Sequence, residues 1–173
     1  MGKYRIGLVG CGGMGRSHLK TLAGMEDFEV VGLCDISRES IGLAREICGE
    51  TAGFDDYGQM YDELKPDAVT VATQTRGHHG PTVAALERGI SVLCEKPISI
   101  DLQEADEMVA SGEKSGAKLA INQQNHVNPA VRRGQALVRE GALGELVTVR
   151  GRNKCGRKSG NEFTEMGTHV TDM

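Results

Sequence analysis

The sequence predicts an α/β fold built on a doubly wound parallel sheet. Three features lead to this prediction. Apolar, β-branched runs recur along the first 122 residues, amphipathic helix-like stretches separate them, and polar or glycine-rich segments follow them. Strands that alternate with helices pair in parallel through right-handed crossovers. Such a sheet binds its ligand beyond the carboxyl ends of the strands.

The same pattern places the elements in order. Expected strands cover residues 6–9, 28–35, 54–57, 68–73, 90–97 and 118–122, and expected helices cover residues 14–24, 37–47, 59–64, 81–88 and 101–115. Residues 73–80 are expected to form a polar loop. Ser37 is expected to cap the second helix, and Asp101 with Glu104 to begin the last one in the manner of a capping box.

From about residue 123 the pattern changes. A helix is expected from Asn128 and Pro129 to Arg139, with asparagine as N-cap and proline at the first helical position. One strand over residues 144–153 and, after a polar loop, a final helix should follow. A lone strand and helix cannot bury their own apolar faces. Residues 123–173 are therefore predicted to begin a second, α+β domain that is incomplete in this chain.

A glycine motif separates the first strand from the first helix. It reads G-x-G-x-x-G and consists of Gly10, Cys11, Gly12, Gly13, Met14 and Gly15. Gly10 permits the tight turn, Gly12 lets the backbone approach a pyrophosphate, and Gly15 lets helix and strand pack closely. Asp35 ends the next strand about 20 residues further on, the spacing of a carboxylate that accepts ribose hydroxyls. Residues 1–122 are thus predicted to be a dinucleotide-binding domain, although the motif alone would also fit a loop without a ligand.

Composition argues against several classes of function. The chain has 173 residues and a net charge of −4 with both signs mixed throughout, which indicates neither nucleic acid nor an acidic membrane as a partner. No apolar run approaches the roughly 18 residues of a membrane span, and the first strand begins too early for a signal peptide. Five cysteines without a C-x-x-C pair favour reduced thiols and a cytoplasmic protein. No metal site is expected.

Four stretches resemble the Gfo/Idh/MocA oxidoreductases, named for glucose–fructose oxidoreductase and inositol dehydrogenase. They read GLVGCGGMGRSH, VATQTRGHH, VLCEKPISIDLQEA and EMGTHVTD, and Glu-Lys-Pro at the end of the fifth strand is the most specific part. Members of that family have an N-terminal Rossmann domain and a C-terminal domain on a large open sheet. The resemblance implies that this chain is the N-terminal portion of a longer protein that forms a homo-oligomer.

The resemblance also implies roles for individual residues. Lys96 would contact substrate and cofactor, His169 would remove the hydroxyl proton, and Glu165 would orient His169. It further implies a cis peptide bond between Lys96 and Pro97. Glu165 stands where the family usually has aspartate, which places the orienting carboxylate on a longer arm.

Two further residues depart from the family pattern, and the change at His126 leaves the substrate class open. His126 stands where many members have arginine, and Gln74 where many have proline. The remaining predicted cofactor contacts lie after the strands of the sheet. They are Asp35, Arg38, Thr73, Gln74, His78, Glu95 and Lys96. Arg38 can stack on adenine or pair with a 2′-phosphate, but Asp35 repels that phosphate, which favours NAD and leaves NADP possible.

The chemistry expected of these residues is oxidation of a secondary alcohol. If the last residues are helical, Glu165, His169 and Asp172 share one face, where a carboxylate can hold the imidazole in one tautomer. Lys96 would stabilise the developing alkoxide. A Glu/His pair on a terminal helix is also typical of a solvated surface, as is a lone lysine. His18 is expected to pack within the first helix, and His79 to face solvent.

The sequence therefore predicts an NAD(P)-dependent oxidoreductase that transfers a hydride between a nicotinamide and a hydroxyl of a sugar, cyclitol or related polyol. Two alternatives stay open. One is a redox-assisted glycosidase of the same family that recycles a tightly held NAD, and the other is a dinucleotide-binding protein without turnover. Residues 1–173 alone are expected to bind the cofactor with little or no catalysis.

Overall fold

The computed structural model describes residues 2–150 of the chain. By compactness the chain divides into two units, Met1–Ile121 and Asn122–Met173. Each unit is described separately below.

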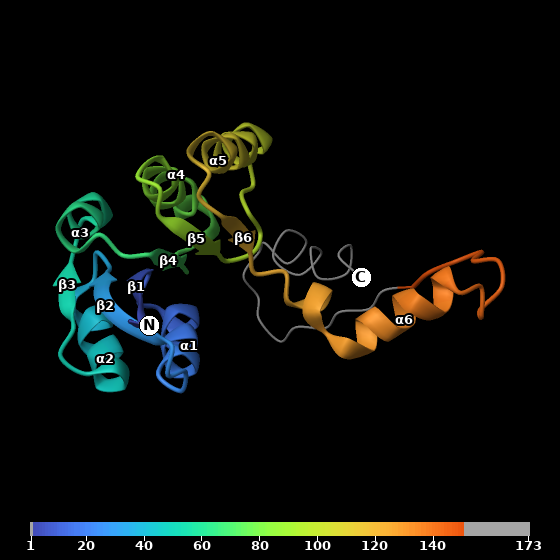
Figure 1. The fold of residues 1–173 in the computed structure, drawn as a ribbon, viewed down its shortest axis with the longest axis horizontal. Helices are drawn as coiled ribbons and strands as arrows, with labels where there is room; N and C mark the ends of the chain where they lie inside the picture. The colour runs from blue at the N-terminus through green and yellow to red at the C-terminus, as the bar shows by residue number, and fades with distance from the viewer. Residues whose placement is uncertain (1, 151–173) are drawn as a thin grey trace. The chain divides into compact units, whose positions relative to one another are not determined.

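The first unit is built on a six-stranded sheet in the order β3-β2-β1-β4-β5-β6 (Figure 1). Its strands are β1 (Tyr4–Val9), β2 (Phe28–Cys34), β3 (Ala52–Phe54), β4 (Ala68–Val71), β5 (Ser91–Cys94) and β6 (Leu119–Ile121). Every neighbouring pair is parallel. The chain runs outward from β1 to β3 and then returns to place β4 on the other side of β1. The predicted doubly wound sheet is confirmed, and its direction reverses between β1 and β4.

Helices cover both faces of this sheet. They are α1 (Gly13–Leu22), α2 (Arg38–Cys48), α3 (Tyr57–Leu64), the short 3₁₀ helix η1 (Thr75–Gly77), α4 (His79–Glu87) and α5 (Leu102–Ser115). Helices α1 and α2 pack together on one face, and α3, α4 and α5 cover the other (Figure 1). Each face has its own apolar core: Leu8 and Leu33 of the sheet pack with Leu19 of α1 in one, and Met60 of α3 and Leu86 of α4 belong to the other.

Local capping explains where two of the helices begin. The Ser37 hydroxyl accepts a hydrogen bond from the Ser40 N–H at 3.2 Å, as predicted. Asp101 caps α5 by accepting the Gln103 N–H at 2.8 Å. Glu104 does not close the expected capping box, because its carboxylate accepts the Ser99 hydroxyl instead.

The loop after β4 is shorter than the sequence suggested. Residues 75–77 form a 3₁₀ turn, and α4 begins at His79 rather than at Pro81. Pro81 is thus the third residue of the helix. Proline is tolerated there because the N–H groups of the first turn have no intrahelical acceptor. His78, just before the helix, is buried, whereas His79 is partly exposed and contacts Glu107 at the surface.

The described part of the second unit is mainly one helix. A 3₁₀ turn, η2 (Gln124–Val127), leads into α6 (Pro129–Arg139). The Asn128 side chain caps α6 by accepting the Ala130 N–H at 2.9 Å, as predicted. The expected strand over residues 144–153 is absent from its described portion, residues 144–150, because a strand requires a hydrogen-bonded partner and residues 122–150 supply none. The expected helix up to Met173 lies outside the described residues.

Within residues 2–150, none of the helices combines the length and the apolar character that crossing a bilayer would require.

Candidate functional site

The glycine turn after β1 fits closely against the end of β4. Gly10 has a φ of +93°, and a Cβ atom there would lie 2.7 Å from the carbonyl carbon of Ala72 and the nitrogen of Thr73. A Cβ atom on Gly15 would lie 1.9 Å from the carbonyl oxygen of Gly10. Glycine is required at both positions, since both contacts are with backbone atoms that cannot move aside.

The middle of the motif is open where its ends are crowded. A Cβ atom on Gly12 or on Gly13 would meet no atom within 4 Å, and the Met14 side chain is 49% exposed. Gly12 is the N-cap of α1 and offers no side chain to the first N–H groups of that helix. These groups have no intrahelical acceptor and lie at the positive end of the helix dipole. The residues present therefore fit a diphosphate at this helix end.

The Asp35 carboxylate accepts a hydrogen bond from the glycine turn and one from the residue before α2. Its Oδ2 atom accepts the Cys11 N–H at 2.7 Å, and its Oδ1 atom accepts the Ser37 N–H at 2.8 Å. Each carboxylate oxygen can still accept a second hydrogen bond. Asp35 thus supports the turn in addition to the ribose contact predicted for it, a role that its spacing from the motif did not suggest.

The Cys11 side chain is fully buried below the same turn. Burial, and next the nearby Asp35 carboxylate, raise the pKa of the Cys11 thiol to about 12. The thiol is therefore neutral at physiological pH and adds no negative charge beneath an anion-binding helix end. Cys11 therefore acts as a small core residue.

The Glu95-Lys96-Pro97 segment lies beyond β5 and is tied to α1. The Glu95 N–H donates to the carbonyl of Val71 at 2.9 Å, which continues the β4–β5 pairing. The Glu95 Oε1 atom lies 2.8 Å from Nε2 of His18 on α1, and its Oε2 atom accepts the Lys96 N–H at 3.2 Å. The peptide between Lys96 and Pro97 is cis, as the resemblance implied.

The contact between His18 and Glu95 was missed by sequence reasoning. His18 was expected only to pack within its helix, yet its side chain is 17% exposed and faces a carboxylate that is 7% exposed. The two residues are 77 positions apart in the chain. A histidine one turn after the last motif glycine was the available signal, but nothing local could name its partner.

The loop after β4 supplies three of the predicted cofactor contacts. Gln74 is exposed, and Thr73 is half-buried. Among the described residues, the buried Thr73 hydroxyl has no hydrogen-bond partner. His78 is only 1% exposed, and its ring lies between the carbonyl oxygens of Pro97 and Thr73. The His78 ring therefore reaches no open surface, and its predicted contact with the cofactor remains a prediction.

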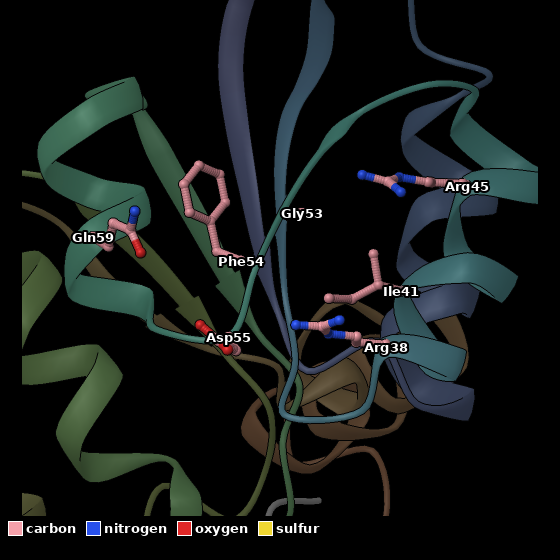
Figure 2. A pocket seen from close by; sticks show the side chains of 7 residues that line it. All are labelled: Arg38, Ile41, Arg45, Gly53, Phe54, Asp55 and Gln59. Atoms are coloured by element: carbon pink, nitrogen blue, oxygen red, sulfur yellow. The ribbon is translucent and has the colours of Figure 1, made fainter.

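Arg38 lines a separate cavity between α2 and the edge strand β3. It lines a cavity of about 400 Å³ together with Ile41, Arg45, Gly53, Phe54, Asp55 and Gln59. Figure 2 shows Arg38, Ile41 and Arg45 projecting from α2 toward the strand segment at Gly53. The Phe54 carbonyl accepts the Asp35 N–H at 3.1 Å, so this cavity neighbours Asp35 through the backbone. No residue of the glycine motif lines it, and the adenine contact of Arg38 stays a prediction.

The predicted proton acceptor and its orienting carboxylate, His169 and Glu165, lie outside the described residues. Within residues 2–150, no three His, Cys, Asp or Glu side chains are grouped so that they could hold a metal ion. The described site thus consists of the glycine turn, Asp35 and the Lys96 segment, at the carboxyl ends of β1, β2 and β5.

Comparison with known proteins agrees with this arrangement. The model of the Gfo/Idh/MocA family, described as an oxidoreductase family with an NAD-binding Rossmann fold, matches residues 4–123. The chain belongs to this family. The match spans all six strands and both ends of the site, from the glycine turn to the Lys96 segment.

Two curated relatives and one solved structure illustrate the similarity. The D-glucoside 3-dehydrogenase of Escherichia coli is 30% identical, over 97% of this chain and 52% of the relative. A glycosyl hydrolase family 109 protein of Akkermansia muciniphila is 28% identical, over 85% of this chain and 33% of the relative. The WlbA dehydrogenase of Bordetella pertussis, in complex with NADH and UDP-GlcNAcA, has a TM-score of 0.78 at 26% identity, over 83% of this chain and 42% of that one. The chain spans about half or less of the length of each.

Alanine at two motif glycines should affect different properties, folding in one case and NAD binding in the other. Gly15→Ala should prevent stable folding, because its Cβ atom would overlap a backbone oxygen. Gly12→Ala should fold normally but weaken NAD binding about tenfold or more, since its methyl group would enter the open space before α1. Thermal unfolding and calorimetric titration with NAD measure the two effects.

Gly42→Ala is the matched control, because Gly42 is an exposed position within α2 that also has open space around it. It should stabilise the helix by up to about 1 kcal/mol and leave NAD binding unchanged. Unaltered NAD affinity in Gly12→Ala would contradict the placement of the diphosphate.

Proposed function

We propose that this chain supplies the dinucleotide-binding part of an NAD-dependent oxidoreductase that acts on a hydroxyl of a sugar, cyclitol or related polyol. One observation carries the proposal. The 2.8 Å contact between His18 and Glu95 brings the open helix end after the glycine turn beside the segment that holds Lys96. This contact supports a site in which the cofactor-binding element and the proposed catalytic cation act together, and relatives named as dehydrogenases of such substrates support the choice of substrate class.

The residues divide the work of binding. The backbone N–H groups at the start of α1 would hold the diphosphate, and the free acceptor positions of Asp35 would hold ribose hydroxyls. The negative charge of Asp35 disfavours a 2′-phosphate, so NAD is the proposed cofactor. Arg38, three residues later and exposed, would cover the adenine side of the site.

The remaining residues would carry out proton transfer and charge stabilisation. When bound, the nicotinamide would accept a hydride from the carbinol carbon of the substrate. His169 would take the hydroxyl proton, and Glu165 would hold its ring in the required tautomer. Lys96 would stabilise the negative charge that develops on the substrate oxygen.

The rest of the proposal concerns the longer protein. Residues 123–173 would begin a second domain that completes the substrate pocket and joins copies of the protein into a homo-oligomer. With reduced thiols, the assembly would work in the cytoplasm.

A second candidate function is a glycosidase that oxidises its sugar transiently and re-reduces it in each cycle. The similarity to a glycosyl hydrolase family 109 protein favours it. The same described residues would serve both reactions, because each begins with removal of hydrogen from a sugar carbon. The net production of NADH distinguishes the two.

Replacing Asp35 should change the cofactor preference. Asp35→Ser removes the negative charge, so NAD should bind about tenfold more weakly and NADP more strongly than in the wild type. Asp106→Ser, which removes an exposed carboxylate from α5, is the control and should leave both affinities unchanged. Titration calorimetry with each dinucleotide measures the effect. A wild-type chain that prefers NADP would contradict the proposed cofactor.

Replacing Lys96 tests the reaction itself in the full-length protein. Lys96→Met should lower kcat for polyol or sugar oxidation by about a hundredfold or more, because charge on the substrate oxygen loses its cation. Lys114→Met on the exposed side of α5 should have no effect. Formation of NADH, followed by its absorbance, is the readout. Sugar cleavage without net NADH would favour the glycosidase, and full activity of Lys96→Met would overturn the role of Lys96.

A further inference from the structure

Two histidines from opposite faces of the sheet contact the segment around Lys96. His18 belongs to α1, and His78 immediately precedes α4 (Figure 1). His18 reaches the carboxylate of Glu95, and His78 reaches the carbonyl of Pro97. Lys96 thus stands between two residues that are each held by an imidazole ring.

The first contact joins α1 to the segment through a carboxylate bound at both oxygens. The Glu95 Oε1 atom lies 2.8 Å from Nε2 of His18, and Oε2 accepts the Lys96 N–H at 3.2 Å. The Glu95 residue is 5% exposed, so the contact is shielded from water. A carboxylate that is engaged at both oxygens cannot rotate freely. The orientation of the Lys96 backbone therefore depends on His18.

The second contact joins the segment to the loop after β4. His78 is 1% exposed, with Nδ1 at 2.9 Å from the Pro97 oxygen and Nε2 at 3.2 Å from the Thr73 oxygen. Thr73 in turn is the residue whose nitrogen limits the space around Gly10. His78 therefore connects the neighbour of the glycine turn with the neighbour of Lys96.

The two contacts of the His78 ring bear on which of its nitrogens carries a proton. Both partners are backbone carbonyl oxygens, which only accept, and a neutral imidazole has a single N–H. Because the Nδ1 contact is the shorter of the two, we place the proton of the neutral ring on Nδ1. A proton on Nδ1 makes His78 a donor to the residue that follows Lys96.

We propose that His18 and His78 are positioning residues that together clamp residues 95–97 and hold Lys96 against the glycine turn. The inference rests on the proposed function, which gives Lys96 a cofactor and a substrate oxygen to be held against. Neither histidine needs to touch the cofactor. Each acts through its neighbour: His18 through Glu95, and His78 through Pro97.

The first test is the proton on His78 in the 173-residue chain. Long-range ¹H–¹⁵N spectra of the imidazole rings distinguish a protonated from an unprotonated Nδ1. The proposal expects Nδ1 of His78 to carry a proton across the pH range in which the chain is folded. An unprotonated Nδ1 would overturn the role of His78, since no hydrogen bond to Pro97 could then exist.

The second test uses paired variants. His18→Leu and His78→Leu remove the donors, whereas His18→Gln and His78→Asn keep a donor near the original nitrogen. Each leucine variant should speed hydrogen exchange at the Lys96 amide about tenfold and weaken NAD binding about tenfold, and the amide variants should restore much of both. His79→Leu is the control, because it breaks a histidine–glutamate contact of the same 2.8 Å length with Glu107 on the surface.

The outcomes separate this inference from the proposed function. NAD binding in the wild type with unchanged Lys96 exchange in folded leucine variants would overturn the clamp and leave the function standing. Faster Lys96 exchange in a chain that never binds NAD would support the clamp and contradict the function. If the leucine variants do not fold, the glutamine and asparagine variants decide, since near-normal exchange at Lys96 is expected only where the donor is kept. An effect of His79→Leu equal to that of His18→Leu would also overturn the clamp.

Discussion

The close approach of the Gly10 turn to the end of β4 is the constraint on which the rest of the site depends. Because a Cβ atom at Gly10 would lie 2.7 Å from the backbone of Ala72 and Thr73, only glycine lets the turn sit at the junction of β1 and β4. That junction is where the sheet changes direction, the position at which sheets of this kind bind their ligands. The contact of Gly15 with the turn then aims the start of α1 into the same space.

The electrostatics around this turn favour an anion at the start of α1. The buried thiol of Cys11 stays neutral, because burial raises its pKa to about 12. The carboxylate of Asp35 accepts two backbone N–H groups, which partly neutralise its charge. The positive end of α1 can therefore attract a diphosphate with little local opposition.

Much of the fold could be predicted because its signals are local. The alternation of strands and helices, the cap at Ser37 and the roles of Gly10 and Gly15 all follow from residues that are close together in the chain. The parallel pairing followed from the handedness of the crossovers that such an alternation requires. The strand expected near residue 147 does not form in the described residues, because strand formation is not a local property. Its apolar pattern is local, but a strand exists only with a partner.

The candidate site was predicted less completely, because its residues meet through contacts that no spacing encodes. Lys96 was found from a motif and His78 from a loop position, yet the burial of His78 between two carbonyls depends on how α4 begins. The His18–Glu95 contact joins residues 77 positions apart, and only the packed sheet brings them together. The sequence therefore predicted candidate residues, and the structure shows which of them contact one another.

The most direct test of the central claim is to record ¹H–¹⁵N amide spectra of the labelled chain during titration with NAD. If the dinucleotide binds between the glycine turn and the Lys96 segment, saturable shifts should concentrate at residues 10–15, at Asp35, and at Glu95 and Lys96. Saturating NAD that leaves these amides unmoved, or that moves only amides of α5 and β6, would contradict the account.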